Sequence, residues 1–399
     1  MTHTFTLTHS YHATPSAIYR AFTTPGGLTD WIAGYSDVDT RVGGRLFIWE
    51  EKGYQVMGKF TALEQDKLVA FDVLGPIASH VAVSISGDGA AATLTLEHSG
   101  LEKEEYVTGY QERWQNALTN LQSTLETGLD RRFYDRPMLG ILIAGSVDAK
   151  NQERYRVPEG YGIIVNGTVP GMGAEKIGLI DEDVIVEMDN IQLTDYYALE
   201  RAVSPHKAGD SVPVAWYRLG EKHRADLPLS GRPIPEIPPT PAELAEAARQ
   251  LYARLDAELA EILDGATESE ADYRPAETEW NAKEIIAHTI ATERAAQIWI
   301  VNAAEGQVFN NWASNDHLLV KSIVDIHTTL PQLTDELHRA EGQTIALVQR
   351  LPATITQFKG AYHNIATNLG KHGLALHTRM HYDVIKNLLE TARKQGVSS

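Results

Sequence analysis

The spacing of hydrophobic residues changes twice along the chain, and residues 1–130 mix the periods of strands and helices. Apolar and polar residues alternate in several short runs, which is typical of β-strands; the runs are "THTFTLTHSYHAT", "YQVMGKFTALE", "KLVAFDVLG", "VAVSISGDG" and "AATLTLEHSG". Thr14 and Pro15 suit the N-cap and first turn of a short helix. A longer helix is predicted from "TGYQERWQNALTNLQSTLETGLD", with an apolar stripe made of Trp114, Leu118, Leu121 and Leu125. This part therefore reads as an α+β domain.

Residues 135–232 are rich in strand patterns and glycine. The strand-like runs are "MLGILIAGSV", "EGYGIIVNGTV", "DVIVEMDNIQL", "DSVPVAWYRL" and "HRADLPLSG", and two short helical stretches, "AEKIGL" and "DYYALERAV", interrupt them. This pattern predicts a small β-rich domain.

A proline-rich stretch separates this region from the last. "SGRPIPEIPPTP" favours an extended, semi-rigid spacer, and we take residues 233–241 as the linker. Thr240, Pro241 and Glu243 then suit the start of a helix. From there the period is helical in four long stretches, about 241–264, 281–304, 328–351 and 373–394, which predicts an all-α four-helix bundle over residues 241–397. The whole chain is expected to be multidomain.

Composition narrows the function classes. The chain of 399 residues has no cysteine, which excludes disulfides, thiolate ligands and a cysteine nucleophile, and fits a cytoplasmic protein. Its formal net charge of −18 argues against general nucleic-acid binding, which needs basic residues to displace counterions from phosphates. No 18-residue apolar run and no signal peptide are recognisable, so no membrane association is expected.

Two histidines four residues apart are the main chemical signal. In "LALHTRMHYDVIKNLL", His377 and His381 share a helical stripe with Val384 and Leu388, and such a stripe normally faces a core. Two imidazoles there are either buried partners in a polar network or two ligands of one metal ion. Neutral imidazole suits zinc, nickel, copper or iron.

Residues 1–130 resemble the START-like (SRPBCC) helix-grip superfamily, in the branch named for activators of a heat-shock-protein ATPase. The resemblance rests on "ATPSAIYRAFTTPGGLTDWI", "VGGRLF", "GKFTALEQDKLVAF", "TLTLEHSG" and "GYQERWQNALTNLQSTLETG". It implies a curved antiparallel sheet around the long helix, often with an apolar cavity for a small-molecule ligand. Trp31, Trp49 and Trp114 would line such a cavity, or are ordinary core aromatics.

Residues 135–232 resemble a PDZ domain of the bacterial protease-associated type. The resemblance rests on "YGIIVNGTVPGMGAEKIGLIDEDVIVEMDNIQL", "DYYALERAV" and "AGDSVPVAWYR". It implies capture of protein C-terminal peptides by strand addition. By motif position the carboxylate-binding loop is Tyr161, Gly162, Ile163 and Ile164, and Leu199 and Val203 wall the pocket. Alternatively, the domain is an internal spacer with a closed groove.

Residues 241–397 resemble the DinB-like metal-binding bundles, on "WNAKEIIAHTIATER" and "HTRMHYDVIKNL". The resemblance implies a divalent metal, often nickel or zinc, on His288, His377 and His381. The residues agree, because Ile285, His288 and Thr292 share one stripe and three imidazoles match a catalytic site with an open position. A cluster of satisfied buried histidines, or histidines facing solvent at a helix end, is the alternative.

Two functions are therefore expected. In the first, the bundle is a metal-dependent transferase or hydrolase acting on a small electrophile, with a divalent metal (nickel, zinc, iron or manganese) and a low-molecular-weight thiol as cofactors, since some DinB-like proteins use such thiols. In the second, the protein is a non-enzymatic adaptor that holds an apolar ligand or client and binds protein C-termini. DinB-like bundles often pair, so a homodimer is left open in both.

Overall fold

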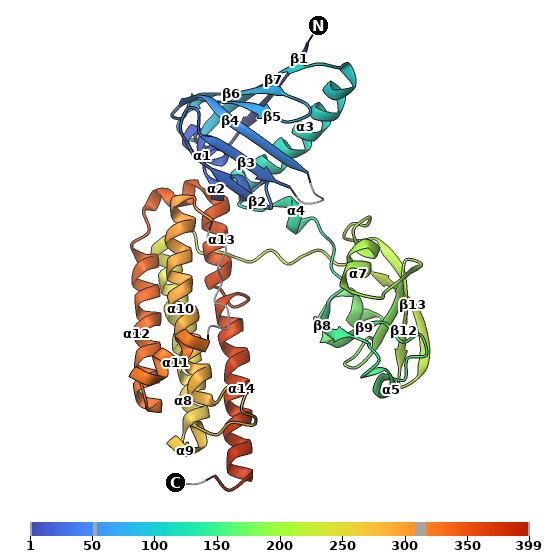
Figure 1. The fold of residues 1–399 in the computed structure, drawn as a ribbon, viewed down its shortest axis with the longest axis vertical. Helices are drawn as coiled ribbons and strands as arrows, with labels where there is room; N and C mark the ends of the chain where they lie inside the picture. Colours follow the sequence, from blue (N-terminus) through green and yellow to red (C-terminus); the bar gives the residue numbers. More distant parts are fainter. Residues whose placement is uncertain (1, 51–53, 309–316, 398–399) are drawn as a thin grey trace. The chain divides into compact units, whose positions relative to one another are not determined.

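The computed structural model describes residues 2–50, 54–308 and 317–397. Residues 1–129 and 236–399 form one compact unit and residues 130–235 form a second. Figure 1 shows the helices and strands of each. Among the described helices, none combines the length and apolarity needed to cross a membrane.

The N-terminal part of the first unit is a seven-stranded antiparallel sheet with one long helix, α3. The strand order is β1-β7-β6-β5-β4-β3-β2, so neighbours in space are mostly neighbours in sequence. The elements are β1 His3–Tyr11, α1 Pro15–Thr23, α2 Pro25–Thr29, β2 Tyr35–Val38, β3 Arg45–Trp49, β4 Gln55–Glu64, β5 Leu68–Leu74, β6 Ser79–Asp88, β7 Ala91–Leu101 and α3 Glu104–Thr127. This confirms a β-rich N-terminal domain that ends in a long helix.

Local sequence signals account for these elements. The Thr14 side chain accepts a hydrogen bond from the Ala17 amide at the start of α1, as an N-cap does. On α3, Leu118, Leu121 and Leu125 are buried in the same core as the inward-facing residues of the strands. The apolar face of α3 and the apolar face of the sheet therefore pack against each other in a single core.

The second unit is a small sheet with short helices around it. Its six strands follow the order β13-β12-β10-β9-β8, with β11 paired to β10. The elements are α4 Arg131–Tyr134, β8 Ile141–Ser146, α5 Gln152–Tyr155, β9 Ile163–Thr168, α6 Gly173–Lys176, β10 Val184–Met188, β11 Ile191–Gln192, α7 Tyr196–Val203, β12 Ser211–Arg218 and β13 Glu221–Pro228. Strand β9 is central, whereas β8 lies at an edge.

The C-terminal part of the first unit is helical. Helix α8 packs on α12 and α14, and α10 packs on the same two helices, so the four long helices enclose one core. The elements are α8 Pro241–Leu263, α9 Glu268–Ala271, α10 Ala282–Glu305, α11 His317–Ile326, α12 Leu330–Gln349, the short 3₁₀ helix η2 Ala353–Gln357, α13 Lys359–Leu369 and α14 Leu374–Lys394. The four long helices start and end close to the predicted positions. Helix α13 lies between the predicted helices 328–351 and 373–394, where the sequence pattern predicts no helix.

Candidate metal centre

Helix α10 carries His288 through the middle of the bundle. The helix begins with a complete capping box, in which the Asn281 and Glu284 side chains each accept a hydrogen bond from the other residue's backbone amide. Every residue from 282 to 293 is buried, so this half of the helix is covered on all sides. His288 is only 3% exposed. An imidazole in such a position needs a polar partner or a ligand.

Helix α14 carries the other two histidines, and its buried face differs from the predicted stripe. The predicted stripe of His377, His381, Val384 and Leu388 was wrong at Val384, which is 45% exposed. The buried face is rotated by about one position and comprises Leu374, Ala375, Thr378, Tyr382, Ile385, Leu388, Leu389 and Ala392. His377 and His381 are half-buried at the border of this face. They are therefore accessible from one side, as an open coordination position requires.

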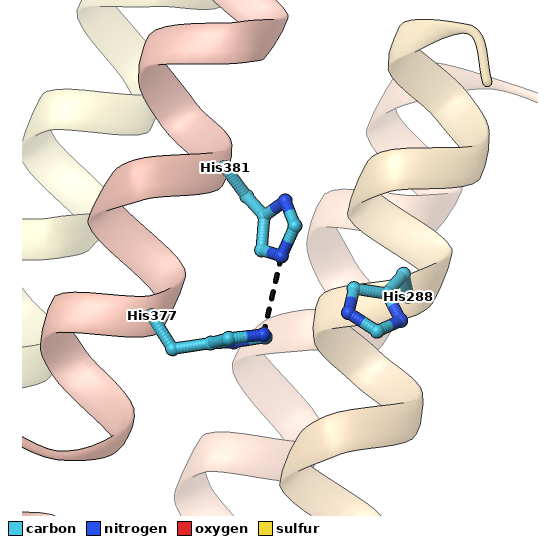
Figure 2. Close-up of side chains that lie close together, drawn as sticks. All are labelled: His288, His377 and His381. Carbon is cyan, nitrogen blue, oxygen red and sulfur yellow. Dashed lines mark hydrogen bonds between the residues drawn. The ribbon is translucent and has the colours of Figure 1, made fainter. Parts of the chain in front are cut away.

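The three histidines meet between α10 and α14 (Figure 2). The Nε2 atoms of His377 and His381 are 3.2 Å apart and share a hydrogen bond (Figure 2). The His288 ring centroid lies 5.4 Å from that of His377 and 4.9 Å from that of His381. One ring nitrogen of each histidine lies within 4.8 Å of a ring nitrogen of the other two. Ligands about 2.0–2.1 Å from a tetrahedral ion are roughly 3.4 Å apart, so the α14 pair already has ligand spacing.

Burial holds these imidazoles in the neutral form, which is the form that binds a metal. Desolvation, followed by the nearby His381 and His377, lowers the pKa of His288 to about 4. Desolvation also lowers the pKa of His377 and of His381, with His377 adding to the effect on His381. Each ring therefore has an unprotonated nitrogen to offer at neutral pH.

Orphaned nitrogens provide a test of whether a metal ion fits. The Nδ1 atoms of His288 and His377 are buried and have no hydrogen-bond partner among the described residues. The hydrogen bond between His377 and His381 satisfies part of the cluster, but it leaves His288 without a hydrogen-bond partner at Nδ1, so hydrogen bonds among the described residues do not satisfy all three rings. The donor set, three neutral imidazoles with one partly open side, suits zinc or nickel. The residues present therefore fit a divalent ion.

The Trp280 side chain borders the histidines. Its ring centroid lies 5.0 Å from that of His288, and its indole nitrogen donates a hydrogen bond of 3.1 Å to His317 Nδ1. The spacing of His317 from the other histidines of the sequence matches no metal-ligand pattern. The tertiary structure places it next to the tryptophan that borders the triad, which sequence spacing does not reveal.

The acidic residues considered near the triad have other roles. Glu284 closes the capping box and pairs with Arg274 at 2.8 Å, and Asp383 is exposed. Glu293 is 1% exposed and accepts hydrogen bonds from Tyr252 and Thr344, and its burial raises its pKa to about 7. Neither Glu284 nor Asp383 is placed as a base.

Sequence analysis missed Glu341 on α12. It is 3% exposed, and burial together with the neighbouring Asp256 raises its pKa to about 10. A signal was present in the sequence, because Glu341 occupies the stripe position between Leu337 and Thr344 in which an apolar residue is expected. A charged residue on a core stripe marks a polar site inside the bundle.

The expected peptide-binding residues fall on a strand that is paired on both sides. Ile163 and Ile164 belong to β9, where they are paired with β8 and with β10. A further strand cannot be added there, because both edges are occupied. Gly162 precedes β9 with φ near +149°, Tyr161 is half-buried, and Leu199 and Val203 pack into the core of this unit. The outer strands of the described sheet are β13 and β8, and on β8 the apolar residues Leu142 and Ile143 are exposed.

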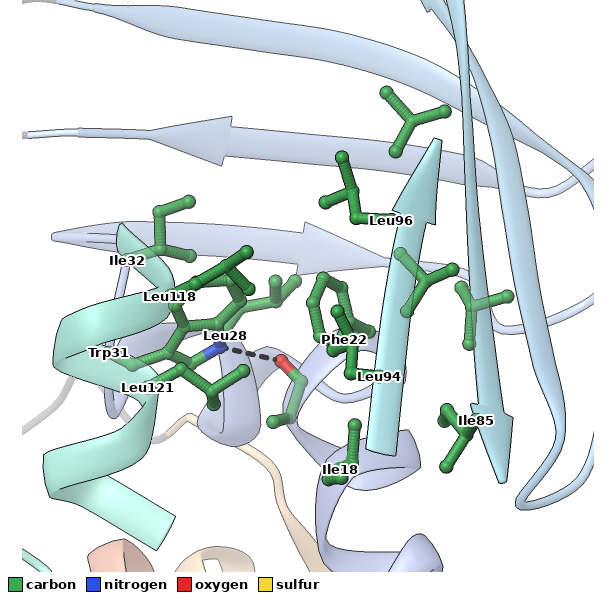
Figure 3. Close-up of a cluster of buried hydrophobic side chains, with 14 of the residues drawn as sticks. Ile18, Phe22, Leu28, Trp31, Ile32, Ile85, Leu94, Leu96, Leu118 and Leu121 are labelled. Atoms are coloured by element: carbon green, nitrogen blue, oxygen red, sulfur yellow. Dashed lines mark hydrogen bonds between the residues drawn. The ribbon is translucent and has the colours of Figure 1, made fainter. Parts of the chain in front are cut away.

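The three tryptophans of the expected ligand cavity have different surroundings. Trp31 is 1% exposed and donates a hydrogen bond of 3.0 Å to the Ala21 carbonyl within the apolar core (Figure 3). Trp49 is 37% exposed. Trp114 alone lines a cavity of about 30 Å³ between α3 and the sheet, which has room for one or two water molecules. That cavity is also bordered by Tyr54, Tyr110 and the ion pair of Glu50 with Arg113.

Comparison with known proteins identifies the N-terminal domain. Residues 12–126 match the family model described as "Activator of Hsp90 ATPase homolog 1-like protein". Solved structures similar to the chain include the Aha1 dimer from Colwellia psychrerythraea, at 20% identity over 31% of this chain and 96% of that one, with a TM-score of 0.29. An HSP90 activator from Plasmodium falciparum is 24% identical over 31% of this chain and 95% of that one, with a TM-score of 0.28.

A second similarity is to proteases. The serine protease Do-like HtrA of Lactococcus lactis subsp. lactis is 29% identical over 99 residues, which are 24% of this chain and 24% of the protease. The same protease of Lactococcus lactis subsp. cremoris is 29% identical over 119 residues, 29% of this chain and 28% of the protease. The chain thus spans only about a quarter of the length of these relatives. What the comparisons establish is that residues 12–126 match the family of activator-of-Hsp90-ATPase homologues.

Proposed function

We propose that residues 241–397 bind a divalent metal ion through His288, His377 and His381 and act as a metal-dependent transferase or hydrolase on a small electrophile. The observation that carries the proposal is the convergence of three neutral imidazoles from two helices, with the α14 pair 3.2 Å apart. A bundle core has no structural need of such a cluster, because apolar residues of similar volume would pack there without orphaned nitrogens.

The chain's own residues would prepare this chemistry. When bound, the ion supplies Lewis-acid activation of a water or thiol at its open position. His288 is held by the fully buried half of α10, so its position is rigid. His377 and His381 are half-buried, which leaves one approach for a substrate. The chain has no cysteine, so a thiol nucleophile would come from a low-molecular-weight cofactor.

Elemental analysis of the untagged protein tests this proposal. We expect about one equivalent of zinc or nickel in the wild type and none in the His377→Ala/His381→Ala variant. Transfer of small thiols to electrophiles, and hydrolysis of the same compounds, would then be assayed on both proteins. A protein that takes up no metal when offered nickel, zinc and manganese would exclude the enzyme and make the histidines packing residues.

A second candidate function is an adaptor role, and the free edge of β8 favours it. An exposed edge with unpaired backbone groups is a site for adding a peptide strand. Leu142 and Ile143 on this strand are 53% and 41% exposed, and Ile141 borders the same core as Val203 of α7. The N-terminal domain would contribute binding to a chaperone or its client, in line with the names of its relatives.

Peptide titration tests the adaptor role. We expect fluorescently labelled peptides with a free C-terminal carboxylate to bind the full chain more tightly than the same peptides with an amidated C-terminus. Fluorescence anisotropy measures both affinities. Equal affinity of the two forms, or no binding of either, would contradict capture of C-termini.

A further inference from the structure

A second polar cluster lies in the bundle core, on residues other than the histidine triad. Asp256 on α8 and His338 and Glu341 on α12 each offer one ligand atom, and these atoms lie within 4.8 Å of one another. His338 and Glu341 are three residues apart on one helix, so they share a face. Helices α8 and α12 pack against each other, which brings Asp256 to that face.

The carboxylates of this cluster have few partners besides one another and His338. Glu341 is 3% exposed, yet neither of its oxygens has a hydrogen-bond partner among the described residues. Asp256 Oδ1 is buried, accepts no hydrogen bond from a described residue, and lies 3.4 Å from His338 Nε2, within ion-pair distance when His338 is protonated. Two more buried oxygens lack partners, Glu293 Oε1 and the Tyr382 hydroxyl, and both groups interact electrostatically with Glu341. A buried carboxylate without a partner is costly, so a positive charge or a proton must compensate it.

A single proton would compensate less of the buried negative charge, and leave more oxygens without a partner, than a divalent cation would. A proton shared between Glu341 and Asp256 satisfies one oxygen of each and leaves the other Glu341 oxygen without a partner. A divalent cation accepts several oxygen ligands and one imidazole at once. The 3.4 Å separation of Asp256 Oδ1 and His338 Nε2 also equals the spacing of two ligands around one ion with bonds of about 2.1 Å. The His338 side chain is 45% exposed, which gives a cation a path from solvent.

We propose that Asp256, His338 and Glu341 form a second divalent-cation site, separate from the histidine triad. Two carboxylates and one imidazole form a harder donor set than three imidazoles, so this site should favour manganese or iron(II) where the triad favours zinc or nickel. The two groups share no residue and lie on different helix pairs, the triad on α10 and α14 and the second group on α8 and α12. An ion at the second site would neutralise buried negative charge and link α8 to α12.

Manganese binding, measured by the electron paramagnetic resonance signal of free Mn²⁺, tests this site on the full chain. The His377→Ala/His381→Ala variant removes the triad, so any remaining tight binding belongs elsewhere. We expect about one equivalent of Mn²⁺ to bind this variant after chelator treatment. Adding Glu341→Gln or His338→Ala should weaken that binding at least tenfold. Glu336→Gln, on the same helix but paired with Arg294, is the matched control and should leave binding unchanged.

Three outcomes would overturn the inference. One is no Mn²⁺ binding to the triad-deficient variant. Another is binding that neither Glu341→Gln nor His338→Ala weakens. The third combines two results: the Glu341→Gln variant is at least as thermally stable as its parent, and Mn²⁺ changes the thermal stability of neither protein. That result would mean that a shared proton, and no cation, compensates the cluster. His338→Ala guards against misfolding, because its side chain is nearly half exposed and its loss leaves the core intact.

Discussion

Replacing His288 with alanine is expected to lower the affinity of the protein for zinc by about a hundredfold to a thousandfold. Structural zinc sites with a full set of protein ligands bind with apparent free energies of about 10–16 kcal/mol, so one ligand contributes roughly 3–4 kcal/mol. Competition with a chromophoric chelator at pH 7 measures the affinity. At that pH the wild-type ring is neutral, since its pKa is lowered to about 4.

His363→Ala is the matched control for this measurement. His363 is also a 3% exposed histidine of the helical part, but it lies on α13 and is not one of the three converging rings. Both substitutions remove a buried imidazole and should destabilise the protein to a similar degree. Only His288→Ala should weaken zinc binding. If zinc affinity survives in His288→Ala and is lost in the α14 double variant, α10 contributes no ligand and a three-histidine site is excluded.

Replacing Trp31 with alanine is expected to destabilise the N-terminal domain by about 3–5 kcal/mol, as is typical of deleting a large buried aromatic side chain. Trp31 packs in the core beside Phe22 and its indole donates a hydrogen bond to Ala21 (Figure 3). The variant would leave a cavity and an unsatisfied buried carbonyl. Because the chain has several domains, hydrogen exchange of peptides from β5 to β7 would report the local free energy of opening.

Trp49→Ala provides the matched control for Trp31→Ala. Its side chain is 37% exposed at the end of β3, so its removal should cost less than about 1 kcal/mol. Equal destabilisation by the two substitutions would contradict the assignment of Trp31 to the core and Trp49 to the surface. Faster hydrogen exchange in Trp49→Ala alone would instead show that the exposed Trp49 ring stabilises the sheet.

Much of the fold follows from local patterns. The caps at Thr14 and Thr240 and the leucine stripe of α3 are local signals, and the structure confirms the elements that they predict. Each of these features depends on residues within a few positions of one another, so it can be predicted from the sequence. The same applies to the change to helical period after Pro241.

The candidate sites are built from several helices or strands at once, so local sequence patterns predict only part of each site. The spacing of His377 and His381 places them on one face of α14, but the burial of that face is decided by packing, which turns Val384 to solvent. Likewise, a strand pattern contains Ile163 without revealing that β8 and β10 occupy both of its edges. Strand order is a property of the sheet, and no local period encodes it.

The sequence by itself determined the β-rich N-terminal domain, the positions of the long helices and the candidate histidines, whereas the grouping into two compact units, 1–129 with 236–399 and 130–235, comes from tertiary contacts. Hydrophobic periodicity, helix caps and the metal-binding chemistry of histidine depend on single residues or close neighbours, so they can be recognised in the sequence. Only the tertiary structure decided which of these residues meet: the convergence of His288 with the α14 pair, the free edge at β8, and the unpartnered Glu341 beside Asp256 and His338. The physical reason is that burial and partner choice arise from contacts between elements far apart in sequence, which depend on how whole helices and strands pack.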